Sequence, residues 1–278
     1  MTGFVQSKIE LERDVQNELL NWKNKRHHTV LQIEGPWHVG KTHEVKKFVY
    51  SHYKQVVYVN LVRDEYGFED LMLTDHFMRE YCRNAGIGEY VDDESTVLVI
   101  DEIQERANVY NAIRDLREQL GCDIIVSGSY LARTVNSRDF FLPAGIAYLQ
   151  MYPLSFKEFC RALNIEDILE TISLKSESKD EDYQKLEEAY QVYRKIGGYP
   201  LVVTTFIESR QIDDCMVVLE DLIRTFTAES SRFFTNSTAL SIFQEAYKAV
   251  LVQIAEEEKG TGKTFLEFVT NFVKDTVK

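Results

Sequence analysis

Short apolar runs alternate with longer amphipathic stretches through the first 150 residues of the chain. A short apolar run without alternation is typical of a strand that is buried on both faces, as in a parallel sheet covered by helices. The stretches between these runs carry apolar residues at helical spacing. We therefore predict a doubly wound α/β fold with a parallel five-stranded sheet. The expected strands cover residues 29–33, 56–61, 96–101, 122–127 and 147–151.

Helical patterns flank the expected sheet and dominate the rest of the chain. Amphipathic helices are expected at about residues 5–25 and 104–120. After Pro153 the strand patterns fade, so we expect a core domain at 1–153 and an all-helical domain at 154–278. A Ser-, Lys- and acid-rich stretch at 173–182 predicts an exposed link within that second domain.

Composition and charge narrow the classes of function. The chain has 278 residues, and its formal net charge of −13 argues against binding of nucleic acid by the whole surface. No segment reaches the roughly 20 apolar residues that span a membrane, and the first residues lack a signal-peptide core, so we expect a cytoplasmic protein. The cysteines stand far apart, and we expect buried, reduced thiols rather than disulfides or a metal site. They are Cys82, Cys122, Cys160 and Cys215.

A G-x-x-x-x-G-K-T pattern follows the first expected strand and precedes an expected helix. Its two glycines can adopt backbone angles closed to other residues, so that N–H groups turn inward and cradle phosphate oxygens together with the helix N-terminus. Lys41 is expected to reach the β- and γ-phosphates, and Thr42 to offer its hydroxyl to Mg²⁺. The alternative is a glycine-rich turn with a surface lysine, and His38 either faces solvent or touches nucleotide. The expected binding residues are Gly35, Pro36, Trp37, His38, Val39, Gly40, Lys41, Thr42 and His43.

An acidic pair, Asp101 and Glu102, ends the third expected strand. At the carboxyl edge of the sheet, Asp101 is expected to hold Mg²⁺ through water or Thr42. Glu102 can orient and polarise an attacking water as a general base. Alternatively, the two acids only cap the helix expected near Gln104, because acidic residues favour helix N-termini. The phosphate-loop pattern earlier in the chain favours the metal-and-water interpretation.

Four sequence segments carry a family resemblance. They are Asp-Glu-Ile-Gln at 101–104, Gly-Ser at 128–129, Pro-Leu-Ser-Phe-x-Glu-Phe at 153–159 and Gly-Gly-x-Pro at 197–200. Together with the phosphate loop, and in this order, they resemble the AAA+ superfamily of P-loop ATPases. More narrowly, they are similar to a prokaryotic ATP-binding group that usually continues into a winged-helix segment and a C-terminal domain of unknown function. The resemblance implies ATP as the nucleotide and a helical lid.

The resemblance also implies roles for single residues. Ser127 or Ser129 would be the polar sensor of the γ-phosphate, although a hydroxyl at a strand end also fits a simple turn. Pro200 would lie near the base, and the same motif equally fits a helix end followed by a new helix. Relatives carry Gly-Arg shortly before the fifth strand where this chain has Gly145 and Ile146, so no arginine finger is assigned. The candidates are Arg133, Arg138, Arg161 and Arg194.

Three functions stay open on this evidence. The favoured one is an ATP-binding, Mg²⁺-dependent ATPase that moves a lid or a partner. Ile146 motivates the second, a nucleotide-gated binding module with negligible turnover. The third, a small-molecule kinase, is disfavoured because Glu102 beside Asp101 would favour water. The helical C-terminal part is expected to pack in the core or to bind a protein partner or a second copy. Its apolar stripe consists of Phe265, Phe268, Val269, Phe272 and Val273.

Overall fold

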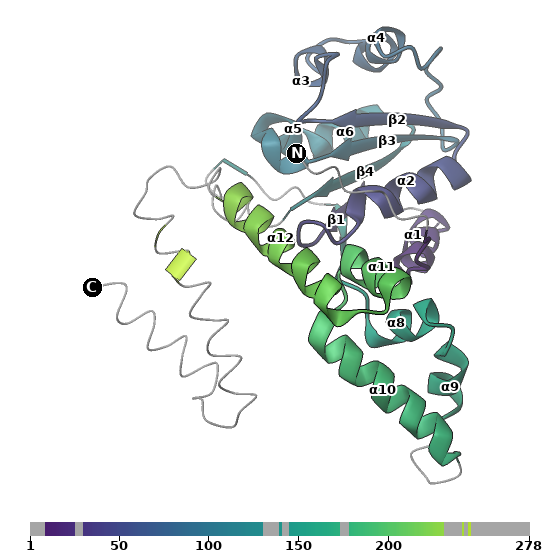
Figure 1. Ribbon diagram of the computed structural model, residues 1–278. Coiled ribbons are helices and arrows are strands. Elements are labelled where there is room, and N and C mark those ends of the chain that lie inside the picture. The colour runs from purple at the N-terminus through teal and green to yellow at the C-terminus, as the bar shows by residue number, and fades with distance from the viewer. Residues whose placement is uncertain are drawn as a thin grey trace. The chain divides into compact units, whose positions relative to one another are not determined.

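The computed structural model describes residues 9–25, 30–129, 139–140, 145–172, 178–230, 241 and 244–245. Its centre is one five-stranded sheet in the order β2-β3-β4-β1-β5 (Figure 1), and every neighbouring pair is parallel. The predicted α/β fold with a parallel five-stranded sheet, followed by a helical part, is confirmed. The strands are β1 (Val30–Glu34), β2 (Gln55–Asn60), β3 (Thr96–Asp101), β4 (Asp123–Gly128) and β5 (Ile146–Gln150).

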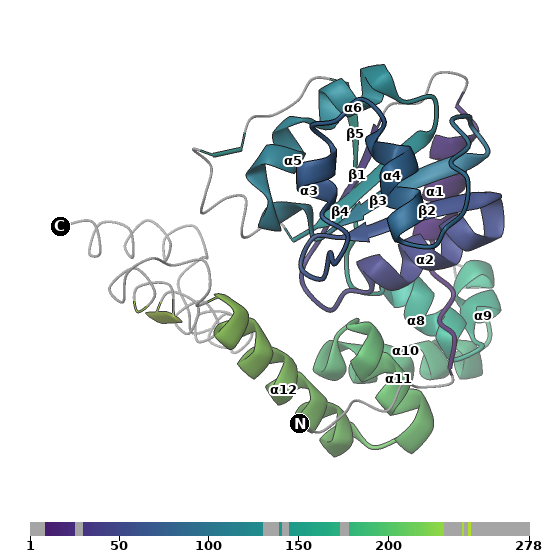
Figure 2. The same ribbon diagram turned by 90° about the horizontal axis from the view of Figure 1, so that it is seen from above.

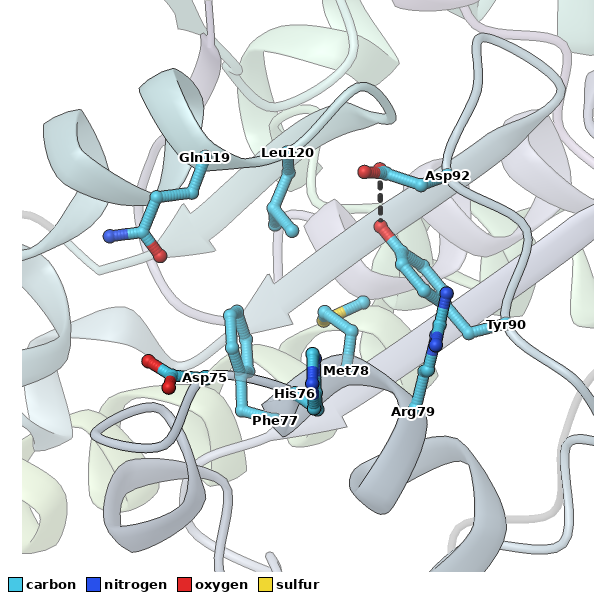
Figure 3. A pocket seen from close by; sticks show the side chains of 9 residues that line it. All are labelled: Asp75, His76, Phe77, Met78, Arg79, Tyr90, Asp92, Gln119 and Leu120. Carbon is cyan, nitrogen blue, oxygen red and sulfur yellow. Dashed lines mark hydrogen bonds between the residues drawn. The ribbon is translucent and has the colours of Figure 1, made fainter.

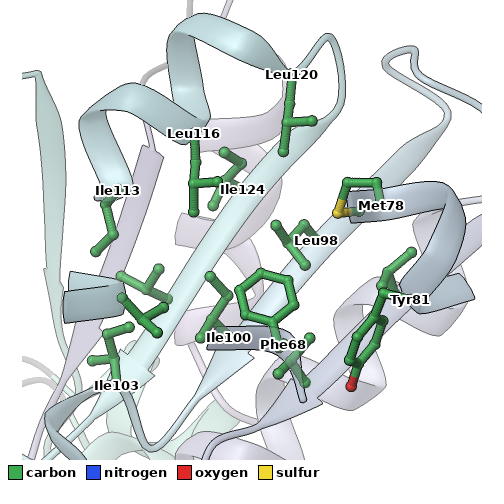
Figure 4. Packing of buried hydrophobic residues seen from close by; sticks show 14 of the residues in the cluster. Phe68, Met78, Tyr81, Leu98, Ile100, Ile103, Ile113, Leu116, Leu120 and Ile124 are labelled. Carbon is green, nitrogen blue, oxygen red and sulfur yellow. The ribbon is translucent and has the colours of Figure 1, made fainter. Parts of the chain in front are cut away.

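The sheet is covered on both faces because successive side chains of its strands point to opposite sides. Leu98 and Ile100 of β3 pack in one apolar cluster, whereas Val97 and Val99 pack in another. Figure 4 shows the first cluster, in which Phe68 lies against this face of the sheet. The first face is covered by α3 (Phe68–Leu71), α4 (Phe77–Asn84), α5 (Ala107–Asn111) and α6 (Ile113–Gln119), and the second by α1 (Val15–Lys23) and α2 (Lys41–His52).

The single helix expected from about 104 to 120 is wrong. A short 3-10 turn, η1 (Ile103–Glu105), follows β3 and is separated from α5 by Arg106. Arg106 has extended backbone angles, φ −136° and ψ 98°, which end the first helical turn. The apolar spacing did not reveal this break because Ile103, Val109 and Ile113 still pack in one cluster.

The helix expected at 5–25 is shorter than predicted where the structure describes it. Residues 9–13 are not helical, and α1 begins at Val15. The reason is packing: Leu11 belongs to the apolar cluster of the later helices, while Val15 and Leu19 belong to the cluster under α2. A non-helical segment lets neighbouring residues reach two different cores.

Helices follow β5 and form a third apolar cluster beside the sheet (Figure 2). The helices of the cluster are α8 (Phe156–Ala162), α10 (Asp180–Ile196), α11 (Pro200–Ser209) and α12 (Ile212–Ser230). Between α8 and α10 in the chain lies α9 (Glu166–Thr171), which has no buried residue. The chain divides into two compact units, Met1–Leu222 and Ile223–Lys278, so residues 154–222 belong to the same unit as the sheet. The link expected at 173–182 lies partly outside the described residues, and α10 already begins at Asp180.

Two motifs that lie far apart in the sequence meet where the sheet passes into the helices. The Leu154 N–H donates to the Gly198 carbonyl oxygen at 2.6 Å, and the Tyr193 hydroxyl donates to the Leu154 carbonyl at 2.7 Å. A Cβ atom on Gly198 would lie 2.1 Å from the Leu154 oxygen. Glycine is therefore required here for close approach of two backbones.

The other expectations have mixed outcomes. All four cysteines are buried and outside disulfides, as predicted. Among the described residues no helix is long and apolar enough to cross a membrane. The apolar stripe that begins at Phe265 lies outside the described residues.

Replacement of Gly198 by alanine tests the contact between the two motifs. We expect Gly198→Ala to lower the free energy of unfolding by about 3 kcal/mol, because the clashing atom is backbone and cannot turn away. The measurement is denaturant unfolding. Gly86→Ala is the control, since Gly86 has φ +68° but open space around its Cβ position. It should cost only about 1 kcal/mol, and an equal loss in both variants would contradict the interpretation.

Candidate functional site

The phosphate-loop pattern occupies the turn between β1 and α2, where the sequence places it. Gly40 has φ +96°, which only glycine adopts readily, and α2 starts at the next residue. Gly35 needs no such angle, so the conformational argument made for it is wrong. It is required because a Cβ there would lie 2.2 Å from the Met151 carbonyl oxygen, just after β5. The loop therefore joins a strand to a helix N-terminus, an arrangement that can bind an anion.

Lys41 is buried at the start of α2. Its ammonium group donates to the carbonyl oxygens of Gly35 at 2.9 Å and Pro36 at 2.8 Å. Burial lowers the pKa of Lys41, while the nearby carboxylates of Glu102 and Asp101 act in the opposite direction. The lysine therefore lies between the loop and the acidic pair. Pro36, His38 and His43 are exposed at the loop, and Trp37 is partly buried.

Asp101 collects hydrogen bonds from three elements of the fold. Its Oδ2 accepts from the Thr42 hydroxyl at 2.8 Å and from the Tyr58 hydroxyl at 2.5 Å. Its Oδ1 accepts from the Ser127 hydroxyl at 2.5 Å. Only 2% of Asp101 is exposed, so these donors replace the water that a buried carboxylate loses. The two predicted metal ligands, Thr42 and Asp101, are thus in contact.

Tyr58 is a site residue that the sequence reasoning missed. It lies on β2 two residues from the strand end, and burial followed by its hydrogen bond to Asp101 raises its pKa. The Lys46 ammonium lies 4.2 Å from the centre of its ring. The sequence offered only a tyrosine within an apolar strand. That β2 neighbours β3 in the sheet, with Tyr58 paired to Val99, became visible only in the fold.

Glu102 follows Asp101 in a left-handed conformation, with φ +59° and ψ +41°. Such a backbone is uncommon for a residue other than glycine, and it turns the side chain away from the strand direction. Its Oε2 accepts a hydrogen bond from the Gln104 side-chain amide. Burial raises the pKa of Glu102, with the Gln104 bond opposing and Asp101 adding to the rise.

The two serines proposed as sensors lie in different surroundings. Ser127 points to the face that carries α2 and donates to Asp101. Ser129 is buried, and its N–H donates to the Gln104 side-chain oxygen at 3.1 Å. Gly128, between them, leaves room for this amide, because a Cβ there would lie 2.3 Å from the Gln104 oxygen.

A buried arginine before α1, also missed from sequence, joins the loop to the helices after β5. Arg13 donates to the carbonyl oxygens of Val39 at 3.3 Å and Tyr152 at 2.7 Å, and to the Glu158 carboxylate at 3.0 Å. Burial alone would raise the pKa of Glu158, but backbone N–H donors and Arg13 lower it. Glu158 also completes a capping box with Ser155 at the start of α8.

Pro200 begins α11 next to the phosphate loop. A Cβ on Gly40 would lie 3.7 Å from the Pro200 ring and 4.0 Å from the Arg13 guanidinium. The residues predicted to contact phosphate and base are therefore brought together. Of the four arginine-finger candidates, Arg161 is held in ion pairs with Asp14 and Glu166, and Arg133 and Arg138 lie outside the described residues.

A separate pocket of about 220 Å³ lies at the opposite edge of the sheet (Figure 3). His76, Arg79 and Leu120 are among its lining residues, and the Tyr90 hydroxyl donates to Asp92 at 2.7 Å on its wall. Asp92 precedes β3 and Leu120 precedes β4, so this pocket is at the amino ends of the strands. None of the residues predicted for the phosphate site lines it.

The family-model match and one solved structure agree with the fold. Residues 27–160 match the family model described as AAA domain. The Walker-type ATPase of Pyrococcus abyssi has a similar structure, with a TM-score of 0.51 and 13% identity over 96% of this chain and 90% of that one. The Holliday junction branch migration motor of Thermotoga maritima gives a TM-score of 0.39 and 16% identity, with 76% of this chain and 70% of that one covered.

A curated relative covers a smaller part. A stretch of 110 residues is 29% identical to an uncharacterized protein of Haemophilus influenzae, and it spans 40% of this chain and 24% of that protein. The strand order, the phosphate loop and the family match agree on one conclusion. Residues 27–160 are therefore similar to an AAA domain, and the chain has the fold of a P-loop NTPase.

Proposed function

We propose that the chain binds ATP with Mg²⁺, hydrolyses it, and uses the reaction to move the helical domain or a bound partner. The observation that carries the proposal is the 2.8 Å hydrogen bond between Thr42 and Asp101, which are 59 residues apart in the sequence. It joins a loop with the geometry of a phosphate cradle to an acidic pair. Hydrolysis of a phosphoanhydride needs positioning and charge neutralisation more than covalent chemistry, and this site offers both.

The residues of the loop would bind the phosphates. Lys41 would exchange its contacts with the carbonyls of Gly35 and Pro36 for phosphate oxygens, which are stronger acceptors because they are charged. Thr42 and Asp101 fit Mg²⁺, since both present oxygen atoms and this ion is usually held by one or two protein oxygens plus substrate phosphates. Among the described residues there is no cluster of three or more His, Cys, Asp or Glu side chains for a metal bound by protein alone. When bound, Mg²⁺ neutralises charge on the phosphates.

Glu102 would act as the general base or positioner of the attacking water. Its position directly after Asp101, at the carboxyl end of β3, supports this role. Ser127 is the sensor that we favour, because its hydroxyl already lies at Asp101. Ser129 is the second candidate and would act through Gln104.

The contacts of Arg13 support a coupling between nucleotide and lid. A guanidinium that bonds both the loop at Val39 and α8 at Glu158 transmits a displacement of either element to the other. Pro200 would touch the base from the start of α11. We keep residues 1–153 as the core and 154–278 as the lid and its continuation.

The alternative is a nucleotide-gated module with negligible turnover. It is favoured by the hydrogen bond that occupies Glu102 and by the ion pairs that occupy Arg161. An arginine supplied by a second copy would convert such a module into an ATPase. A homo-oligomer or a protein partner would form through the helical C-terminal part.

Lys41→Ala tests the phosphate contact. We expect ATP affinity to fall on the order of 100-fold, because a charge-assisted hydrogen bond is worth about 2–3 kcal/mol. Calorimetric titration with ATP and Mg²⁺ measures it. Lys54→Ala, an exposed lysine outside the site, is the matched control and should bind as the wild type does. Unchanged affinity in Lys41→Ala would rule out the phosphate cradle.

Glu102→Gln tests hydrolysis. We expect ATP binding to be retained and phosphate release to fall by about 10²–10⁴-fold, the usual contribution of a general base. Single-turnover phosphate release measures it, with Glu105→Gln as a control for loss of a nearby negative charge.

Wild-type rates in Glu102→Gln would overturn the catalytic assignment. Specific activity that rises with protein concentration would point to an arginine supplied by a second copy. Negligible release by the wild-type protein at every concentration would favour the nucleotide-gated module.

The lid coupling predicts a change in hydrogen exchange. In Glu102→Gln, ATP should slow amide exchange in α11. Bound nucleotide would stabilise the form in which α11 lies against the phosphate loop, and this effect grows with ligand saturation. Mass spectrometry of peptides covering 200–209 measures it, and α6 on the other face should not change. Protection confined to α2 would show that nucleotide binds without engaging the lid.

A further inference from the structure

A small cavity lies behind the acidic pair, under the carboxyl ends of β1 and β4. Its volume is about 10 Å³, and Gln32, Gln104 and Ser129 line its polar side. Ile103 and Tyr110 close it from the apolar side. All these residues are less than a tenth exposed. A cavity of roughly 10–15 Å³ is the least that holds one water molecule.

Two buried polar atoms at this cavity have no hydrogen-bond partner in the part of the chain that the structure describes. They are the side-chain oxygen Oε1 of Gln32 and the hydroxyl Oγ of Ser129. Gln32 is 2% exposed and Ser129 is 6% exposed. An unsatisfied buried polar atom costs about 1–3 kcal/mol, so native proteins rarely keep two of them at one cavity.

The same residues belong to two short series of hydrogen bonds, one on each side of the cavity. On one side, the Gln32 amide donates to the Glu34 carboxylate, directly before the phosphate loop. On the other side, the Ser129 N–H donates to Gln104, whose amide donates to Glu102. The gap in this series of hydrogen bonds lies between Gln32 Oε1 and Ser129 Oγ, which find no partner among the described residues.

The direction of each hydrogen bond in this series is fixed. A backbone N–H can only donate, so the oxygen of Gln104 must face Ser129 and its NH₂ must face Glu102. In the same way, a carboxylate at Glu34 draws the NH₂ of Gln32 and turns its oxygen towards the cavity. Gly128 is required because any Cβ there would displace the Gln104 oxygen.

We propose that one water molecule binds between Gln32 and Ser129 and completes a buried relay from the phosphate-loop strand to Glu102, with Gln104 as the positioning residue for that carboxylate. The water donates one hydrogen to the Gln32 oxygen and bonds the Ser129 hydroxyl. Gln104, which lies in η1 and accepts a hydrogen bond from the Ser129 N–H after β4, then holds the Glu102 carboxylate through its amide. The inference rests on the proposed hydrolysis, since it assigns what orients the base.

Gln104→Leu is the test of the positioning role. It removes both amide bonds and keeps a buried side chain of similar reach. We expect single-turnover phosphate release to fall by about tenfold while the Kd for ATP stays unchanged, and the retained Kd also shows that the variant is folded. In the Glu102→Gln background the same substitution should have no further effect, because Gln104 acts only through Glu102.

The outcomes separate this inference from the proposed function. If Glu102→Gln is inactive but Gln104→Leu hydrolyses as the wild type does, the positioning role is wrong and the ATPase stands. If Gln104→Leu lowers release equally in both backgrounds, the residue has a general structural role and the inference fails. If Glu102→Gln hydrolyses at the wild-type rate, the proposed function itself fails.

Ser129→Ala tests the water separately. With water bound, loss of the hydroxyl removes a satisfied hydrogen bond, and we expect the unfolding equilibrium constant to rise about fivefold. In a dry cavity the same change removes an unsatisfied group and should lower the unfolding equilibrium constant. That result would contradict the proposed water molecule. Ser51→Ala, which removes an exposed hydroxyl on α2, is the control. An atomic-resolution crystal structure of the full chain should show a water within hydrogen-bond distance of Gln32 and Ser129.

Discussion

A buried carboxylate must be surrounded by donors, and Asp101 obtains its donors from the elements that have to meet for the site to exist. Thr42 comes from the helix after the phosphate loop, Tyr58 from β2, and Ser127 from β4. Because β3 lies between β2 and β4, one acid at its end is within reach of both neighbours. Removal of any donor would leave charge uncompensated in a site that is almost closed to water. This requirement fixes the loop, the sheet edge and the acidic pair relative to one another.

The helices after β5 are tied to that centre by buried polar contacts rather than by apolar packing alone. Arg13 bonds the loop, the end of β5 and Glu158 at once, and Leu154 meets Gly198 backbone to backbone. A buried ion pair is a poor source of net stability, because desolvation offsets most of the attraction. Its directional bonds are better suited to fixing geometry. Arg13 therefore links the phosphate loop to α8 directly.

Glu102 is held from two directions by different means. Its backbone is left-handed, and its carboxylate accepts a hydrogen bond from the amide of Gln104, whose oxygen in turn accepts from the Ser129 N–H. If Glu102 is the base that we propose, this constraint leaves it little rotational freedom to lose when a substrate binds, which would favour turnover. The hydrogen bond from Gln104 would also occupy an oxygen that the attacking water needs, which would favour a resting state.

The sequence alone determined the sheet, the loop and the acidic pair. Buried parallel strands leave uninterrupted apolar runs, and a phosphate loop needs Gly40, Lys41 and Thr42 in consecutive positions. Both patterns therefore consist of neighbouring residues and can be recognised from local order in the sequence. Local order did not reveal the break at Arg106 or the short α1, because apolar spacing continues through both. Tyr58, Arg13 and Gln32 join the site only because strand order and buried packing bring distant segments together. The tertiary structure decided their roles, since a donor for a buried carboxylate is selected by position in space rather than by its neighbours in the chain.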